Sequence, residues 1–235
     1  TPWTLPGNTG LAVHETADYS IVELEGEGGS HRFVLAQALV SANIKQDHNI
    51  VGTIKGSDLV GLGYTPLYDP NEFGSQVRRF VRRPGPGGMV TELEDGGEFA
   101  PKVIAADFVS LDDGTGIVHI APAFGDEDLG VGREKELSFV QPVDLQGIIT
   151  GNYPFAGKFV KTADKEIMED LTDRGLLYHQ DIYRHTYPFC WRCDTPLLYY
   201  AKSSWYIRTS ALKDQLVGGN DTINWYPDYI KDGRF

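Results

Sequence analysis

The chain has 235 residues, of which 41% are hydrophobic and 11% aromatic, a composition typical of a folded globular protein and unlike that of a disordered one. This length suits one large domain or a domain with an appendage. The formal net charge of −12 excludes a broadly basic nucleic-acid surface, so any contact with RNA is expected to be local. No apolar run reaches membrane-spanning length, and the chain starts at Thr1 and stops at Phe235, so we expect a cytoplasmic, non-membrane fragment of a larger protein.

Residues 1–9 (TPWTLPGNT) are polar and rich in turn-forming residues. The two prolines fix the backbone and remove N–H donors, which predicts an ordered loop or a strand edge rather than a helix. The threonine hydroxyls, the amide of Asn8 and the ring of Trp3 form a set that suits the wall of a small polar pocket. The alternative is an ordinary entry into a strand, with Trp3 in the core.

Short apolar runs predict strands at residues 11–13, 19–24, 50–54, 59–62 and 103–111. Ser30 is a good N-cap residue and predicts a helix that carries Phe33, Ala36, Leu39 and Val40. Many short strands separated by glycine-containing turns are typical of a β-barrel or a compact mixed sheet. The expected fold class is therefore mixed β/α.

Positive charge is concentrated only in residues 76–88 (QVRRFVRRPGPGG), in a cluster made of Arg78, Arg79, Arg82 and Arg83. These guanidinium groups suit contacts with phosphates, and Phe80 suits stacking on a base. The alternative is a solvated face of a strand or hairpin. Residues 89–100 follow as an acidic, glycine-containing segment, for which we predict an exposed loop.

The segment from residue 103 to the next helix is strongly patterned. An Asp-Gly turn at residues 113–114 is a strong hairpin signal for the strand at residues 103–111. The next strand is predicted at residues 117–120, an apolar run that ends before Pro122. Asp126 is a good N-cap, and the acidic residues after it are typical of the first turn of a helix.

Two ionisable side chains, His119 on this strand and Asp128 in the first helical turn, bracket one loop. The helix dipole and the free N–H groups of a first turn favour an ionised carboxylate. Asp128 is therefore a candidate anchor for the cation of a ligand. The alternative is that the acidic residues 126–128 only cap the helix.

Beyond this helix, residues 139–149 predict a pair of strands around a turn. A second helix is predicted to start at Thr162 or Asp164 and to stop at Gly175.

The only two cysteines, Cys190 and Cys193, form a C-x-x-C pair. In a cytoplasmic protein this spacing, followed by Asp-Thr-Pro, indicates a zinc knuckle rather than a disulfide. Structural zinc takes four ligands, so the pair is half a site at best: either the other half lies outside this chain or the metal is absent. A thioredoxin-like redox role is disfavoured because no βαβ pattern surrounds the pair. The aromatic-rich residues 197–235, with a helical stretch near residues 210–216, are predicted to be a return limb.

Several catalytic signatures do not occur in the sequence: the Ser–His–Asp order, a phosphate loop, G-x-G-x-x-G after a strand, and H-E-x-x-H. The residues alone support either a hydrolase that positions water or a binding module for a small zwitterion. A zinc-dependent hydrolase built on Cys190, Cys193 and His185 is disfavoured, because thiolate pairs in ribbons are usually structural.

Three long segments are distinctive: residues 1–14 (TPWTLPGNTGLAVH), 114–128 (GTGIVHIAPAFGDED) and 187–207 (YPFCWRCDTPLLYYAKSSWYI). In this order they resemble the connective insert of isoleucyl-tRNA synthetase, which is its editing domain. INWYP at residues 223–227 and KDGRF at residues 231–235 resemble the place where that insert rejoins the synthetic domain. Trp3, after Thr-Pro, favours the isoleucyl enzyme over its valyl and leucyl relatives, which are kept as an alternative.

The resemblance implies a domain that hydrolyses valine wrongly attached to tRNA(Ile), and also valyl-adenylate. Isoleucine and valine differ by one methylene, which a binding pocket discriminates only weakly. In this family a positioned water attacks the ester, without a cofactor or a covalent nucleophile. The HIGH and KMSKS motifs do not occur in the sequence, so ligase activity is not expected of this chain. A non-catalytic module that docks the tRNA acceptor end is the alternative.

The resemblance also implies roles for individual residues. Asp128 grips the substrate's α-ammonium, and His119 lies beside the amino acid and the terminal ribose, where it helps to exclude isoleucine. Thr1, Thr4 and Asn8 complete the catalytic wall. Further residues expected to bind substrate are Trp3, His185 and Tyr187.

We therefore expect a β-barrel-centred editing domain with peripheral helices at residues 1–186, followed by a half zinc ribbon and return segment at residues 187–235. Cys190 and Cys193 match a structural zinc half-site that a cysteine pair upstream of the insert completes. The expected partners are the acceptor end of tRNA(Ile) carrying valine, valyl-adenylate and the rest of the synthetase chain. A monomer is expected.

Overall fold

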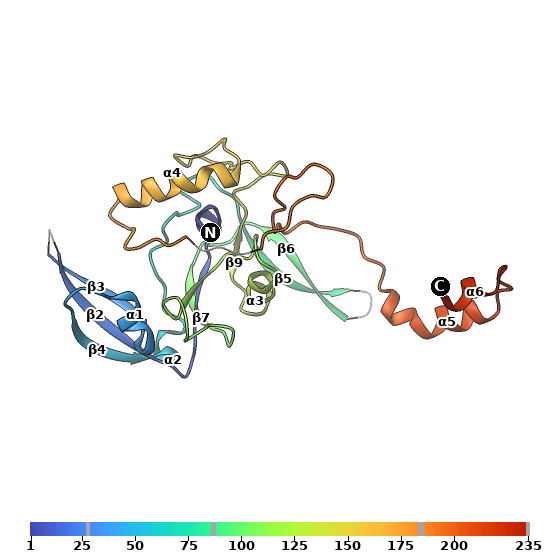
Figure 1. Ribbon diagram of the computed structural model, residues 1–235, viewed down its shortest axis with the longest axis horizontal. Helices are drawn as coiled ribbons and strands as arrows, with labels where there is room; N and C mark the ends of the chain where they lie inside the picture. The colour runs from blue at the N-terminus through green and yellow to red at the C-terminus, as the bar shows by residue number, and fades with distance from the viewer. Residues whose placement is uncertain (27–28, 86–87, 183–185, 234–235) are drawn as a thin grey trace. The chain divides into compact units, whose positions relative to one another are not determined.

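The computed structural model describes residues 1–26, 29–85, 88–182 and 186–233 (Figure 1). The chain divides into two compact units, Thr1–Ala201 and Lys202–Phe235. The predicted functional division at residues 186 and 187 stays a prediction. No helix among the described residues is both long enough and apolar enough to cross a membrane.

The secondary structure alternates short strands with short helices. The strands are β1 (Gly10–Val13), β2 (Asp18–Gly26), β3 (Gly29–Ala36), β4 (Asn49–Lys55), β5 (Val77–Gly85), β6 (Gly88–Asp95), β7 (Lys102–Ala105), β8 (Ile117–Ile120) and β9 (Ser138–Val140). The α-helices are α1 (Val40–Asn43), α2 (Gly56–Leu59), α3 (Asp126–Glu134), α4 (Val160–Asp173), α5 (Lys213–Asp221) and α6 (Tyr229–Gly233). Three 3₁₀ helices are described as well: η1 (Pro2–Gly7), η2 (Gln37–Leu39) and η3 (Thr209–Leu212).

The strands form three-stranded sheets with the orders β7-β1-β8, β3-β2-β4 and β6-β5-β9. The mixed α/β class is confirmed, but the predicted barrel is wrong, because within the described residues these sheets do not close on themselves. Closure requires every edge strand to pair with another strand. Here each sheet keeps two edge strands that each pair with a single described strand; β3 and β4, for example, both pair with β2 and with no other described strand.

Strand β1 occupies the centre of its sheet, parallel to β7 and antiparallel to β8. The hairpin signalled by the Asp-Gly turn is therefore wrong, since β7 and β8 are separated by β1. Strand β7 is shorter than predicted and ends at Ala105, which leaves a connection of residues 106–116 before β8. A connection of that length is free to pass around an intervening strand, whereas a two-residue turn is not.

Residues 30–36 form a strand rather than the start of a helix. Ser30 pairs with Glu25, and the register continues through Phe33 opposite Val22. The neighbouring strand β2 offers a complete ladder, and this pairing overrides the local N-cap signal. Helical structure begins only with η2 and α1.

Residues 59–62 do not form the predicted strand. The backbone N–H groups of Gly56 and Ser57 donate to the carbonyls of Ala17 and Glu15, which turns the chain into α2. A Cβ on Gly56 would lie 2.1 Å from the carbonyl oxygen of His14, so this close approach requires glycine.

The acidic segment 89–100 is not an exposed loop throughout, because its first part is β6, which pairs with β5 in a long hairpin (Figure 1). Opposite charges meet across this hairpin: Arg79 is opposite Glu94 and forms an ion pair with it. Cross-strand charge pairs of this kind favour the observed register.

Several predictions of local structure are confirmed. These are the strands at residues 11–13, 19–24, 50–54 and 117–120, the helix near Asp126, and the helix that ends near Gly175, whose φ is +67°. The predicted helix starts are displaced: the N-cap of α3 is Gly125 rather than Asp126, and α4 begins at Val160 rather than at Thr162 or Asp164. Of the strand pair predicted at residues 139–149, the structure contains β9 and an isolated bridge between Val143 and Ile149.

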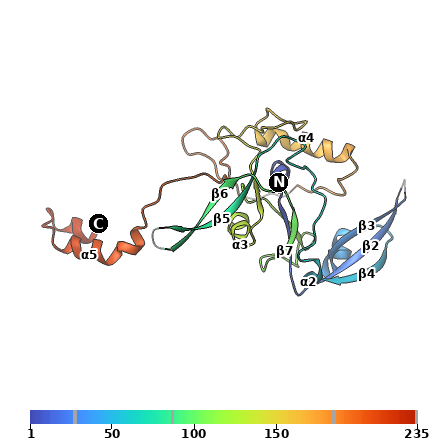
Figure 2. The same ribbon diagram turned by 180° about the vertical axis from the view of Figure 1, so that it is seen from behind.

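Residues 2–7 form a 3₁₀ helix, η1, so the expectation of a non-helical N-terminal segment is wrong. Proline in the first turn of a helix removes only an N–H that has no intrahelical partner, and its fixed φ suits a helical turn. In both views the N-terminal segment lies beside α4 (Figure 1 and Figure 2). The largest core cluster lies around this contact and includes Trp3, Phe124, Phe139, Tyr153, Phe155 and Ile167.

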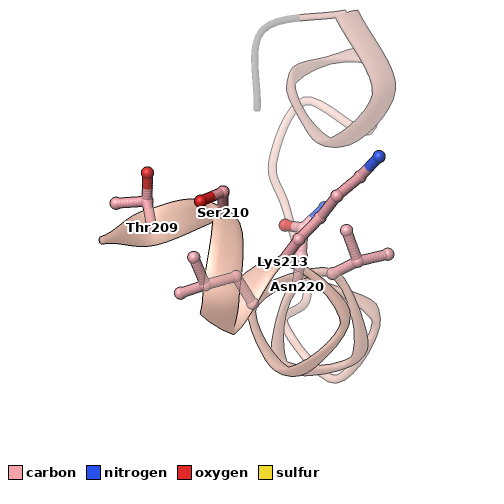
Figure 3. A pocket seen from close by; sticks show the side chains of 6 residues that line it. Thr209, Ser210, Lys213 and Asn220 are labelled. Atoms are coloured by element: carbon pink, nitrogen blue, oxygen red, sulfur yellow. The ribbon is translucent and has the colours of Figure 1, made fainter. Parts of the chain in front are cut away.

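The second unit contains η3, α5 and α6, which confirms the helical stretch predicted near residues 210–216. A shallow depression on this unit is lined by Thr209, Ser210, Lys213, Leu216, Val217 and Asn220 (Figure 3). The predicted site residues all belong to the first unit, so this depression is not part of the candidate site.

Candidate active site

The 3₁₀ helix η1 carries two predicted site residues, Thr4 within the helix and Asn8 at its C-cap. Its first turn is held by α4, because the backbone N–H of Trp3 donates to Oδ1 of Asp164 at 2.9 Å. A carboxylate at this end of a helical turn accepts an N–H that has no intrahelical partner. Burial raises the pKa of Asp164, while the bond from Trp3 opposes that rise.

His119 lies on β8, opposite Leu11 of β1, and both of its ring nitrogens have a partner. Nε2 lies 2.9 Å from Oγ1 of Thr4, and Nδ1 lies 2.9 Å from Nδ2 of Asn8. Burial is the largest influence on His119 and lowers its pKa to about 4. The imidazole is therefore neutral at pH 7, and three predicted residues meet at one ring.

Asn8 is almost fully buried, with 8% of its surface exposed. Its Nδ2 also donates to the carbonyl oxygen of Gly10 at 2.9 Å, and its Oδ1 accepts a hydrogen bond from the hydroxyl of Tyr64. Tyr64 was not predicted as a site residue. No local pattern marks it, because its partner lies 56 positions away in the chain.

Thr1 joins this group through its backbone. Its carbonyl oxygen accepts a hydrogen bond of 2.8 Å from the hydroxyl of Thr4 and lies 3.3 Å from the backbone nitrogen of the same residue. Thr1 itself is exposed. The structure thus brings Thr1, Thr4, Asn8 and His119 into one connected network.

Asp128 lies in the first turn of α3 and folds back over the preceding loop. Its Oδ2 accepts a hydrogen bond of 2.8 Å from the backbone N–H of Ala121. A Cβ on Gly125 would lie 2.9 Å from both Cγ and Oδ1 of Asp128, so glycine at the N-cap leaves room for this conformation. The carboxylate is partly buried.

Burial is also the largest influence on the ionisation of Asp128, and it raises the pKa of this carboxyl; the hydrogen bond from Ala121 opposes the rise. Desolvation thus opposes the stabilisation of the ionised form that the helix start was expected to give, and it outweighs the bonded N–H. A carboxylate whose charge is disfavoured by burial gains from a bound cation, which restores the lost electrostatic stabilisation. Asp128 suits a ligand that carries an ammonium group.

His119 and Asp128 are connected through the backbone at the end of β8. Ala121, whose N–H binds Asp128, follows His119 by two positions and comes directly after the strand that positions the imidazole. The loop between them is rigidly packed, since Ala121, Ala123 and Phe124 are all buried. The two ionisable groups that bracket this loop therefore have fixed positions at its two ends.

Trp3 is a core residue, with 3% of its surface exposed and its ring packed edge-on against Phe124 at 4.9 Å. The ammonium of Lys161 lies 5.6 Å from the centroid of the Trp3 ring and 4.3 Å from that of Tyr187. Lys161, which was not predicted, therefore brings Tyr187 towards the N-terminal helix. The hydroxyl of Tyr187 donates to the carbonyl of Leu197 at 2.6 Å.

His185, the remaining predicted substrate-binding residue, lies outside the described residues. Beside α4, a second depression is lined by Asp164, Lys165, Met168, Glu169, Thr172 and Gln180. Of these six residues, Asp164 is the one that also accepts the hydrogen bond from the backbone N–H of Trp3.

Cys190 and Cys193 lie at a tight turn, in which the N–H of Cys190 binds the carbonyl of Thr195 and the N–H of Asp194 binds the carbonyl of Cys190. Hydrogen bonds from the side chain and backbone of Thr195, and next from Cys190, lower the pKa of the Cys193 thiol. A thiolate is the form that binds zinc, so the pair suits half of a tetrahedral site. Within the described chain, no cluster of three or more His, Cys, Asp or Glu side chains completes it.

The arginines of β5 are divided between the two faces of the hairpin. Arg78 lies 4.6 Å above the ring of Phe139 and donates to Gln141, whereas Arg79 and Arg83 form ion pairs with Glu94. Phe80 is buried, so it is not available to stack on a base.

The fold and the site define a mixed α/β domain with a neutral histidine and a partly buried carboxylate at the two ends of one loop. No family model matches the chain. Over its whole length the chain is 52% identical to the isoleucine–tRNA ligase of Dehalococcoides mccartyi (strain CBDB1), 44% identical to that of Bacillus thuringiensis (strain Al Hakam) and 40% identical to that of Clostridium novyi (strain NT).

These matches confirm the resemblance to isoleucyl-tRNA synthetase, and the chain is homologous over its full length to a segment of that enzyme. It spans about a fifth of the length of these relatives, covering 22% of the first and 20% of the other two. Among solved structures, a crystal structure described as GlLeuRS-CP1 matches with a TM-score of 0.48 at 17% identity, over 77% of this chain and 82% of that one.

Proposed function

We propose that this chain is the editing domain of an isoleucyl-tRNA synthetase and that it hydrolyses valine from mischarged tRNA(Ile), and valyl-adenylate. The observation that carries the proposal is the pair of ionisable groups on the loop after β8, a neutral His119 at one end and the partly buried carboxylate of Asp128 at the other. An aminoacyl ester offers a matching ammonium group next to the carbonyl that is to be attacked.

In the proposed reaction, Asp128 binds the α-ammonium of the valyl group and so orients the ester. The oxygen of a water molecule bonds to the ester carbonyl carbon, the bond from that carbon to the ribose oxygen breaks, and the ribose oxygen takes up a proton. His119 forms a neutral wall beside the amino acid. The network of Thr1, Thr4 and Asn8 holds that wall in place.

We also propose the setting in which the domain acts. The partners are the acceptor end of tRNA(Ile) and the rest of the synthetase chain, and the protein acts as a cytoplasmic monomer. No cofactor takes part in the hydrolysis. Zinc at Cys190 and Cys193 is structural and is completed by a cysteine pair elsewhere in the synthetase.

The decisive experiment is a time course of valyl-tRNA(Ile) deacylation with Asp128→Asn and Asp128→Ala. Asp128→Asn keeps an acceptor for the N–H of Ala121 and removes only the charge. We expect both variants to lose about 10- to 150-fold in rate, the value of one hydrogen bond to a charged group of about 1.5–3 kcal/mol. Glu127→Ala, at an exposed neighbouring carboxylate, is the matched control and should retain the rate.

Full activity of Asp128→Asn would remove the assignment of Asp128 as the ammonium ligand. A wild-type domain that binds the tRNA acceptor end without hydrolysing the ester would favour a docking module instead.

A further inference from the structure

We propose that Tyr64 is a positioning residue: it fixes the side-chain amide of Asn8 and thereby holds His119 in a single neutral tautomer, with the proton on Nε2. Each group in this network has hydrogen-bond partners that fix which atom donates and which accepts.

The orientation of the Asn8 amide is set by a carbonyl group. Nδ2 lies 2.9 Å from the carbonyl oxygen of Gly10, which can only accept a hydrogen bond. The flipped amide would place Oδ1 against that carbonyl, two acceptors at contact distance. Nδ2 therefore faces Gly10, and its second proton points to Nδ1 of His119 at 2.9 Å.

The tautomer of His119 then follows. Because Nδ1 accepts the proton of Asn8, it is not itself protonated, and a neutral imidazole must carry its proton on Nε2. Nε2 donates to Oγ1 of Thr4 at 2.9 Å. Thr4 can accept this bond because its own hydroxyl proton goes to the carbonyl oxygen of Thr1 at 2.8 Å. Nδ2 of Asn8 also lies 3.5 Å from the carbonyl oxygen of Ile120, a longer contact than the 2.9 Å to Nδ1 of His119, so the imidazole is the better placed acceptor for the second proton.

Tyr64 secures the other side of the amide. Its hydroxyl faces Oδ1 of Asn8 and must donate to it, since that oxygen has no proton to give. Burial raises the pKa of Tyr64 far above its ordinary value, so the hydroxyl remains a donor throughout the physiological range. The ring packs against the core cluster around Val13 and Tyr19, which holds the hydroxyl in place.

This arrangement of hydrogen bonds also defines the role of His119 in the hydrolysis, an inference that rests on the proposed function. With both ring nitrogens engaged, His119 is neither the general base nor the general acid of the hydrolysis. Its imidazole ring is instead held in one orientation, and the space that this fixed ring leaves decides which amino acid side chain fits beside it. Loss of the Tyr64 hydroxyl would remove the hydrogen-bond donor to Oδ1, leave the Asn8 amide held through Nδ2 by Gly10 and His119, and so weaken its hold on the imidazole.

The tautomer is measured directly by NMR of the protein labelled with ¹⁵N-histidine, with the His119 signals assigned by their loss in His119→Gln. In the wild type at pH 7 we expect the pattern of a protonated Nε2 and an unprotonated Nδ1. In Tyr64→Phe we expect a mixture of tautomers. Tyr68→Phe, which removes a hydroxyl bound to Asp170 in another cluster, is the matched control and should keep the wild-type pattern.

A protonated Nδ1 in the wild type would overturn the wiring, whether or not any variant folds. An unchanged single tautomer in Tyr64→Phe would overturn the role of Tyr64. Neither result depends on deacylation, so either can be told apart from a failure of the proposed function. As a second readout, the preference for valyl- over isoleucyl-tRNA(Ile) should fall by about 2- to 10-fold in Tyr64→Phe, the range of one neutral hydrogen bond.

Discussion

The backbone N–H of Trp3 donates a hydrogen bond of 2.9 Å to Oδ1 of Asp164, a residue 161 positions further along the chain. This bond links the N-terminal helix η1 to α4. Because η1 carries Thr4 and Asn8, a contact outside the His119 network sets the geometry inside it.

Replacing Asp164 should therefore lower the stability of the fold only where the new side chain cannot accept a hydrogen bond from the N–H of Trp3. Asp164→Leu leaves the N–H of Trp3 buried without a partner, and we expect the free energy of unfolding to fall by about 1–3 kcal/mol. Asp164→Asn keeps an acceptor and relieves the cost of the partly buried charge, so it should be clearly more stable than the leucine variant. Urea denaturation measures both, with Glu169→Leu on the exposed face of α4 as the control. Equal stability of the leucine and asparagine variants would show that the bond does not matter.

The pH dependence of stability should reveal the lowered pKa of the partly buried His119 imidazole. The pKa of His119 is about 4 in the folded state and 6.5 ordinarily, so between these values the unfolded chain binds a proton that the folded chain does not. The contribution of His119 is therefore fully present above pH 6.5 and is lost as the pH falls towards 4.

Unfolding free energies of the wild type and His119→Gln at pH 7 and pH 4.5 isolate this contribution from that of the carboxylates. The wild type should lose on the order of 1–3 kcal/mol more than the variant over this interval. Parallel losses in the two proteins would contradict a lowered pKa.

The arginine cluster of β5 should separate into a tRNA-binding part and a structural part. Arg82 is exposed and, within the described chain, forms no ion pair. If it contacts a phosphate, Arg82→Gln should weaken tRNA binding and reduce its salt dependence by about one charge. Arg78→Gln should instead lower stability by about 1 kcal/mol, because its guanidinium packs on Phe139. The affinity for tRNA, measured from 50 to 200 mM salt, tests this division. If the slope of affinity against salt concentration is the same in Arg82→Gln as in the wild type, the cluster belongs to the solvated surface.

Chelation should separate a structural zinc site from a catalytic one. In the described chain the bonding partners of Cys193 are Thr195 and Cys190, not His119 or Asp128. Treating the full-length synthetase with a chelator should therefore leave deacylation unchanged, while Cys193→Ser should lower its zinc content. Immediate loss of hydrolysis on chelation would favour a zinc-dependent hydrolase instead.

Local sequence signals were enough to predict the loop on which the site is built. The β-branched run of β8, its stop at Pro122 and the acidic start of α3 each act over a few residues, so His119 and Asp128 could be placed at the two ends of one loop. Local signals also made Asp128 a candidate cation anchor and residues 1–9 a candidate pocket wall, whereas the role of His119 and the catalytic assignment of Thr1, Thr4 and Asn8 depended on the resemblance to isoleucyl-tRNA synthetase.

The tertiary structure decided what depends on distant partners. Residues 30–36 form a strand because β2 offers a ladder, and β1 separates β7 from β8 although a hairpin signal lies between them. Asn8 meets His119 across 111 positions and Tyr64 across 56, and no pattern of neighbouring residues encodes such pairs. The energy of a buried hydrogen bond or ladder exceeds a local preference of a few tenths of a kcal/mol, so the tertiary partner prevails where the two disagree.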